Sequence, residues 1–277
     1  MELEHVSEWL VDNKLSLHLG KTESILFGSK PKLKSKSTLS ISCNGTNIQA
    51  TSSVKYLGAT LDQNLSGNDI ARSVVTKSNA RLKYLYRKSQ FLDLHTRKLL
   101  VMSLVQCHFD YVCSFWYPSL TQYWKSRLQT TQNKLVRFIL NMESRSHVGP
   151  EQFKFLNWLP VSKRVDQITL CHVHKIKSDT APEYLKEHFK PLTDVHNRCT
   201  RSRVSALPSS DSKYLSDNYT FRDTGRFSLP KVGSFGRRSF AYNGIVLWNS
   251  LPQHLRDIEA SHTFKPAIKT YLMASLV

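Results

Sequence analysis

Apolar and polar positions along the chain follow two different periods, and the change between them falls near residue 66. Before it, short apolar runs are separated by turn-forming residues, which is typical of strands. After it, apolar residues recur every three or four positions, which is typical of amphipathic helices. The pattern predicts an α+β protein with a mixed region at residues 1–65, a mostly helical region at 66–190 and a loop-rich region at 191–277.

The first region is expected to hold one helix and a few short strands. Residues 3–10 carry apolar side chains at helical spacing, and Asp12-Asn13 favours the end of that helix. Asn44-Gly45 predicts a hairpin turn, because both residues tolerate a positive φ. Lysines alternate with other residues at 30–36 and predict an exposed basic loop. The short runs that predict strands are 24–28, 39–43, 46–49 and 54–61, the last interrupted by Gly58.

The second region is expected to be a helical bundle with basic outer faces. Its helices are expected around Ile70 to Leu85, at residues 94–109, from Leu120 to Phe138 and at 161–176. Arg72, Lys83 and Arg87 fall opposite the first apolar stripe, Lys77 and Arg81 flank it, and Lys134 and Arg137 lie outside the third helix. A charged outer face is usually only solvated, but here few acidic residues accompany the basic ones. This bias favours contact with phosphates.

The last region changes character at about residue 191. Ser, Arg, Gly and Pro dominate residues 193–238, which predicts loops with short strands between them. Residues 239–249 are expected to be ordered again, and 264–272 to form a final helix. Ser261 is a candidate N-cap for that helix, since a serine hydroxyl accepts from free backbone N–H groups.

Charge is the strongest signal in the composition. Thirty-nine Lys and Arg face 21 Asp and Glu, a formal net charge of +18 with an isoelectric point near 9.8. Such a field attracts DNA and RNA, the alternative being a basic protein with no specific partner. The apolar runs are too short for a membrane span, and the N-terminus lacks the pattern of a secretory signal. We therefore expect an intracellular protein, nuclear or cytoplasmic.

The five cysteines contain no C-x-x-C pair, which argues for a reducing compartment. Cys171, His172 and His174 form a small cluster, and only His196 or Cys199 lies near enough in the sequence to complete a zinc site. The three clustered residues do not share one face of the expected helix. We therefore expect no metal there, but a buried cysteine beside solvated histidines.

Catalytic motifs are missing from the sequence. It contains no nucleophile elbow, Walker A loop, dinucleotide-binding fingerprint or H-E-x-x-H motif. The aspartates are scattered and never paired, whereas a two-metal site needs several carboxylates held together. We therefore expect no catalytic residues and no cofactor.

Several motifs in order resemble the LINE-type reverse transcriptases. Residues 9–27, W-L-V-D-N-K-L-S-L-H-L-G-K-T-E-S-I-L-F, resemble the family segment W-x-x-x-N-x-L-x-L-N-x-x-K-T that follows its catalytic Asp-Asp pair. Residues 54–62, V-K-Y-L-G-A-T-L-D, resemble the next K-Y-L-G hairpin. Residues 132–139 are similar to a thumb segment, and L-W-N-S-L-P at 247–252 with Phe264-Lys265 resembles the tail of jockey-type non-LTR retrotransposon polyproteins. The likeness runs nearly end to end.

The resemblance implies a residual palm at 1–65, a thumb-like region at 66–190 and a basic C-terminal region at 191–277. The parent family is an RNA-directed DNA polymerase that uses Mg²⁺, and its metal-binding aspartates precede the segment at which this chain begins. The C-x-x-C knuckle of some LINE tails is also missing. The resemblance therefore implies a polymerase remnant that is not an enzyme as it stands.

The resemblance also suggests roles for individual residues. It places Lys21 near the incoming triphosphate, and Tyr56 and Gly58 at the primer backbone. Without the rest of the palm, however, the sequence favours Lys21 as a plain surface lysine, and the hairpin is equally a plain strand with a bulge. Trp248 is expected to anchor a core. The residues expected to meet the phosphates of DNA or RNA are Arg72, Lys83, Arg87, Lys134 and Arg137.

Three functions stay open on the sequence. The first is a polymerase remnant that binds nucleic acid without sequence preference. The second is a non-functional or domesticated structural or interaction protein whose basic charge is inherited. The third is a truncated gene model of an active reverse transcriptase. Convergence of basic side chains on one face would favour the first over the second.

Overall fold

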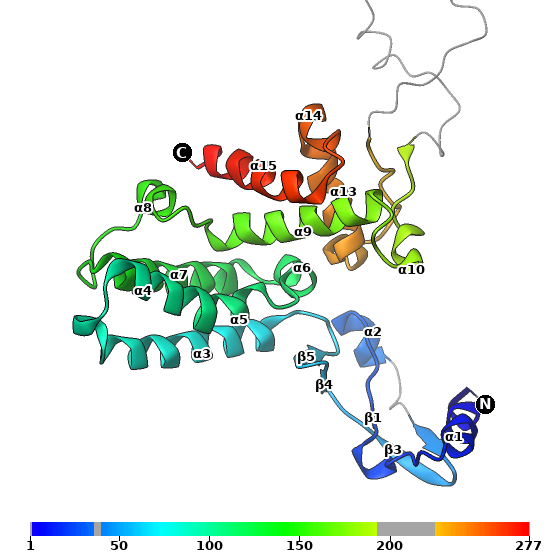
Figure 1. The fold of residues 1–277 in the computed structure, drawn as a ribbon. Helices are drawn as coiled ribbons and strands as arrows, with labels where there is room; N and C mark the ends of the chain where they lie inside the picture. Colours follow the sequence, from blue (N-terminus) through cyan, green and yellow to red (C-terminus); the bar gives the residue numbers. More distant parts are fainter. Residues whose placement is uncertain (1, 36–39, 193–224, 277) are drawn as a thin grey trace, which may run out of the picture. The chain divides into compact units, whose positions relative to one another are not determined.

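The computed structural model describes residues 2–35, 40–192 and 225–276, which form two compact units (Figure 1). The first unit comprises Met1–Val112 with Ser119–Ile139, and the second comprises Cys113–Pro118 with Leu140–Val277. Helices dominate and the named strands are few and short, so the α+β class expected from the sequence is confirmed. The three sequence regions follow composition and resemblance rather than packing, and that division stays a prediction.

The first unit begins with short elements around two small sheets. They are α1 (Glu2–Asp12), η1 (Leu19–Lys21), β1 (Glu23–Ser24), α2 (Lys30–Ser35), β2 (Ile41–Cys43), β3 (Thr46–Ala50), β4 (Ser53–Tyr56) and β5 (Ala59–Asp62). Strand β3 pairs in parallel with β1 and antiparallel with β2, whereas β4 and β5 form a separate antiparallel hairpin. The expected first helix and its end at Asp12 are confirmed.

Both hairpins turn through two residues with positive φ. Asn44 and Gly45 have φ values of 49° and 74°, and Leu57 and Gly58 have values of 47° and 83°. Cys43 pairs with Thr46 across the first turn, as Asn-Gly predicted. The run at 54–61 is interrupted at Gly58, as the sequence predicted, and forms the two strands β4 and β5, because Gly58 readily adopts the left-handed conformation.

Two expectations for this part were wrong. Of the run at 24–28, only Ser24 belongs to a strand, β1 (Glu23–Ser24), and residues 30–35 of the basic segment form not a loop but helix α2 (Lys30–Ser35). Pro31 lies in its first turn, where a missing N–H costs nothing, and the lysines are good helix formers. The side chains of Lys30, Lys32 and Lys34 are exposed as expected.

The rest of the first unit is helical. It contains α3 (Asn68–Tyr86), η2 (Ser89–Phe91), α4 (Leu94–Val101), η3 (Met102–Gln106), α5 (Cys107–Asp110) and α7 (Gln122–Leu140). The helix expected at 94–109 is confirmed, with a π-helical stretch at η3, and Asp93 caps its start by accepting from the Thr96 N–H at 2.9 Å. Helix α3 packs against η3, α5 and β5.

The apolar stripes of α3 and α7 form the core of this unit. Val74, Leu82 and Leu85 are buried as expected, whereas Ile70 is only half-buried and its neighbour Ala71 is fully buried. From α7 the buried side chains are Leu128, Thr131, Gln132, Leu135, Val136, Phe138 and Ile139. The two helices therefore expose their remaining faces.

The second unit is built around one long helix. Its elements are α6 (Cys113–Trp116), η4 (Tyr117–Ser119), α8 (Pro150–Phe155), α9 (Val161–Lys177), α10 (Glu183–Lys186), η5 (Gly236–Arg238), α13 (Phe240–Ser250), α14 (Gln253–Arg256) and α15 (Ser261–Ala274). Helix α9, expected at 161–176, packs against α13 and α15 (Figure 1). Gly244 lets α13 approach closely, because a Cβ there would lie 2.9 Å from Val173 Cγ2.

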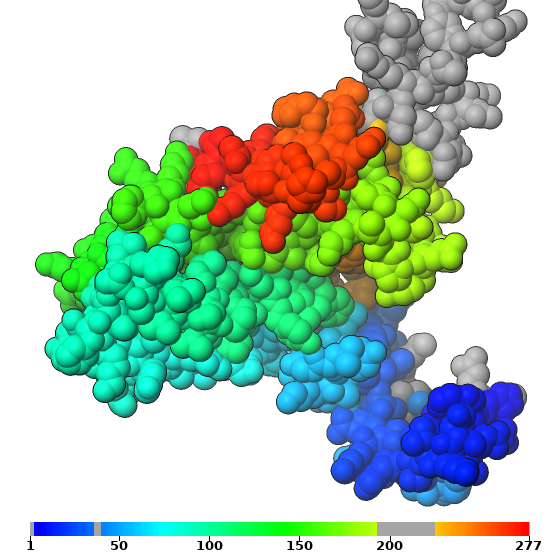
Figure 2. Space-filling model, in the orientation of Figure 1, coloured from blue at the N-terminus to red at the C-terminus, as the bar shows by residue number. Residues whose placement is uncertain are grey.

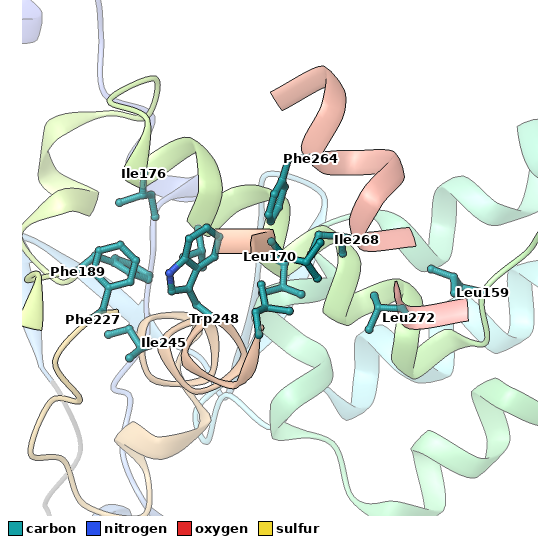
Figure 3. Close-up of a cluster of buried hydrophobic side chains, with 13 residues drawn as sticks. Leu159, Leu170, Ile176, Phe189, Phe227, Ile245, Trp248, Phe264, Ile268 and Leu272 are labelled. Atoms are coloured by element: carbon teal, nitrogen blue, oxygen red, sulfur yellow. The ribbon is translucent and has the colours of Figure 1, made fainter. Parts of the chain in front are cut away.

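Large apolar side chains from α9, α13 and α15 meet in one core (Figure 3). Trp248 is 0% exposed among Leu170, Ile245 and Phe264, which confirms it as a core anchor. Its indole N–H donates to the Gly225 carbonyl at 2.6 Å. This bond satisfies the one polar group of the ring inside the core.

The C-terminal expectations had mixed outcomes. Most of residues 193–238 lies outside the described residues, and 225–238 contains no named strand beyond a single bridge from Phe227 to Pro191. The final helix is confirmed, but Ser261 is not its N-cap. Ala260 occupies that position, and the Ser261 hydroxyl lies 3.3 Å from His174 Nδ1.

Among the described residues no single helix is both long and apolar enough to cross a bilayer, although a bent pair, Leu94–Asp110 with Cys113–Ser119, meets both criteria together.

Candidate nucleic-acid interface

Helix α3 presents an exposed face of nearly one sign of charge. Its buried positions recur at 71, 74, 75, 78, 82 and 85, so every basic residue is left on the outside. Those residues are Arg72, Lys77, Arg81 and Lys83, followed directly by Arg87 and Lys88. Asp69 is the single acidic residue of the helix. The side chains of α3, coloured cyan, reach the surface of the molecule (Figure 2).

An open groove runs beside this face. It has a volume of about 490 Å³ and is lined by Lys77, Ala80, Arg81 and Tyr84 of α3 with Leu104 of η3. Burial lowers the pKa of the nearby His108, and the positive charges of Arg81 and Lys77 lower it further. The groove thus combines positive charge with an exposed aromatic ring, the pairing that suits a phosphate backbone with unstacked bases.

Sequence reasoning noted Lys77 and Arg81 only as flanking residues and missed Tyr84. The three follow one another at positions i, i+4 and i+7, which places them on one side of a helix. That spacing was available in the sequence. The contribution of Leu104 was not, because it depends on how η3 packs against α3.

Arg72 is engaged within the protein. Its guanidinium lies 3.1 Å from a carboxylate oxygen of Asp69 and 5.9 Å from the ring centroid of Trp124. The cation therefore joins α3 to α7, and any phosphate must compete with both partners. Lys83 and Arg87, one turn apart, are exposed on the outer side as the sequence predicted.

The two predicted residues of α7 differ from each other. Lys134 is exposed, whereas Arg137 is half-buried near Tyr86. The Tyr86 ring meets Phe138 edge-on with centroids 5.0 Å apart. Burial raises the pKa of Tyr86, while the positive charges of Arg137 and Arg97 oppose that rise. Arg137 thus lies beside an aromatic cluster and is not a freely solvated cation.

The β4–β5 hairpin exposes its apolar tip. The side chains of Tyr56 and Leu57 are 61% and 75% exposed. Tyr111, just after α5, donates a hydrogen bond to the Leu57 carbonyl, and its hydroxyl lies 3.6 Å from where a Cβ on Gly58 would stand. The tip is therefore held by its backbone while its side chains face solvent. Lys21 lies elsewhere in the unit, exposed on η1, which packs against β3.

A metal site needs several ligand side chains close together. Among the described residues, no three His, Cys, Asp or Glu side chains come together. Of the C-H-x-H cluster, Cys171 is half-buried, and His174 is buried with its ring nitrogen 2.8 Å from the Ile258 carbonyl. The expectation of a solvated His174 was therefore wrong. His196 and Cys199 lie outside the described residues.

Comparison of the chain with protein-family models, with curated proteins and with solved structures found no match. The resemblance to LINE-type reverse transcriptases therefore rests on the sequence motifs alone.

Proposed function

We propose that this chain binds nucleic acid through the phosphate backbone, without sequence preference and without catalysis, as a relative of the C-terminal part of a non-LTR retrotransposon reverse transcriptase. The observation that carries the proposal is the one-signed face of α3 beside the groove at Lys77, Arg81 and Tyr84. Basic residues clustered along one helix beside an exposed aromatic ring are typical of a nucleic-acid-binding surface.

The lack of catalysis is part of the proposal. The Mg²⁺ ions of the parent family need converging carboxylates, and among the described residues none converge, so no step here is assigned to a metal. The chain should incorporate no dNTP on a primed template with Mg²⁺ or Mn²⁺. Incorporation that survives stringent purification would overturn this part and favour the active reverse transcriptase.

The binding test exploits counterion release. Each phosphate neutralised on B-form DNA releases condensed cations, so log K falls with log salt by roughly 0.9 per contact. Replacement of Lys77, Arg81 and Lys83 together with Gln should lower affinity for duplex and RNA–DNA hybrid alike, and flatten the slope by up to about 3 units. Fluorescence anisotropy over a salt series measures both quantities.

A matched control separates the α3 face from net charge. The triple change Lys30→Gln, Lys32→Gln and Lys34→Gln removes the same charge from exposed positions on α2 of the same unit. It should leave most of the affinity and the slope in place. If both triple variants bind equally, or if the α3 variant binds as the parent does, α3 is only a solvated surface. The structural or interaction protein then becomes the better reading.

A further inference from the structure

A second group of cations surrounds a cavity in the second unit. The cavity has a volume of about 270 Å³ and lies between α9 and α15. Arg164 and Lys175 line it from α9 and Lys265 from α15, with His172 and His174 beside them. No carboxylate is among its lining residues in the described part of the chain. Such a site disfavours cations and favours an anion.

A buried amide fixes the geometry of two of these groups. Gln167 is 2% exposed, and its Oε1 accepts from the Arg164 guanidinium at 2.8 Å. Its Nε2 donates to the Lys265 carbonyl at 3.2 Å, which ties α15 to α9. Arg164 and the start of α15 are therefore held in place before any ligand arrives, which reduces the ordering cost of binding.

The pKa of the Cys171 thiol reports on the positive charges around the cavity. Burial raises its pKa, while the charges of Lys265, Arg164 and Lys175 all act to lower it. All three cations are therefore close enough to act on one atom of the cavity wall. Cations this close together repel one another, and a bound anion would reduce that repulsion.

Two aromatic rings, those of His174 and Phe264, also line the cavity. The ring of His174 stacks on Phe264 with centroids 4.2 Å apart and an interplanar angle of 25°. Because the Ile258 carbonyl accepts at 2.8 Å, His174 Nε2 carries the proton, and its Nδ1 accepts from the Ser261 hydroxyl at 3.3 Å. The two stacked rings, each 1% exposed, therefore form a rigid aromatic part of the cavity wall.

We propose that this cavity binds a phosphate monoester, either on a free nucleotide or at the phosphorylated end of a nucleic acid. Three permanent cations suit a dianion better than a single carboxylate. The volume lies near the lower end of small-molecule sites, about 300–1,000 Å³, which limits the attached group to about one nucleotide. The inference is independent of the function proposed for α3, because its residues belong to the other unit.

The test is titration of the full chain by calorimetry with inorganic phosphate, AMP, and a trinucleotide with either a 5′-phosphate or a 5′-hydroxyl. We expect saturable binding of the phosphate-bearing ligands. Arg164→Gln and Lys265→Gln should each raise the dissociation constant at least about tenfold. Lys190→Gln, at an exposed lysine of the same unit, should leave it unchanged. Lys175→Gln, also exposed, replaces Arg164→Gln if the latter fails to fold.

The ligand series identifies the source of the phosphate. Tighter binding of AMP supports a free nucleotide, and tighter binding of the 5′-phosphorylated trinucleotide supports a nucleic-acid end. If the 5′-hydroxyl trinucleotide binds as tightly as the 5′-phosphorylated one, the cavity does not recognise a phosphate monoester. Cavity variants that bind the phosphate-bearing ligands like the parent would also overturn the proposal. The α3 triple variant should bind AMP normally, so failure of this site is distinguishable from failure of the α3 interface.

Discussion

Tyr111 donates its phenolic hydrogen to the main-chain carbonyl of Leu57, 54 positions earlier in the chain. The bond connects the end of α5 to the tip of the β4–β5 hairpin, within the first unit. Leu57 itself is largely exposed, so apolar packing does little to fix the tip. The Tyr111 hydrogen bond therefore helps to hold the Tyr56-Leu57-Gly58 turn, in addition to the packing of β5 against α3.

Removal of that contact should loosen the hairpin. Tyr111→Phe keeps the ring and deletes the donor, and we expect the free energy of unfolding to fall by about 0.5–1.5 kcal/mol. Amide exchange at residues 57–59 should accelerate more than exchange in α3. Tyr123→Phe, at another exposed tyrosine of this unit, serves as the control. Unchanged exchange at the tip would show that the hairpin is held by something else.

Gly58 should tolerate no ordinary side chain. Its φ of +83° is left-handed, and a Cβ would meet the Tyr111 hydroxyl only at an ordinary distance of 3.6 Å. The cost therefore comes from the backbone, and Gly58→Ala should destabilise the protein by about 1–2 kcal/mol. Gly58→Asn should cost less, because asparagine visits this conformation more readily. Chemical denaturation measures both, with Gly233→Ala, where a Cβ meets nothing within 4 Å, as the comparison.

Substitutions of Arg72 and Lys83 should affect different properties, the first mainly stability and the second mainly nucleic-acid binding. Arg72→Gln removes an ion pair to Asp69 and a contact over Trp124, so the free energy of unfolding should fall by about 0.5–1 kcal/mol. Lys83→Gln should leave stability within about 0.5 kcal/mol and reduce nucleic-acid affinity instead. Thermal unfolding and anisotropy on the same samples distinguish the two effects. Equal loss of stability in both variants would contradict the role assigned to Arg72.

His174 should make the protein less stable in mild acid. Burial lowers its pKa below the ordinary value, so the unfolded chain binds more protons as the pH falls through 6.5. The stability that neutral His174 gives to the folded state is fully present above that pH and is lost on acidification. The free energy of unfolding should fall by at most about 1.4 kcal/mol per pH unit. His174→Gln should flatten the dependence between pH 7.5 and 5.5, whereas His254→Gln at an exposed position should not. Denaturant unfolding across this range provides the check.

Local signals in the sequence were sufficient for most of the elements. Asn44-Gly45 specified its hairpin because only a few residue types accept two positive φ values in succession. The 3.6-residue stripes of α3, α7 and α9 specified helices because burial of one face repeats with the helical turn. Local signals failed at 30–35, where alternating lysines concealed a helix, and at Ser261, which lies one residue inside its helix.

The sequence by itself determined the net charge, the basic outer faces and the position of Trp248 in a core, because these depend on composition and on which side of a helix is apolar. Only the tertiary structure decided which cations are available. Arg72 lies over the ring of Trp124, and Arg137 is half-buried where its charge acts on Tyr86; in both cases another segment of the chain brings the aromatic residue to the cation. The same holds for the cavity at Arg164 and Lys265, about 100 residues apart, since contacts at that separation form only when α9 and α15 pack together.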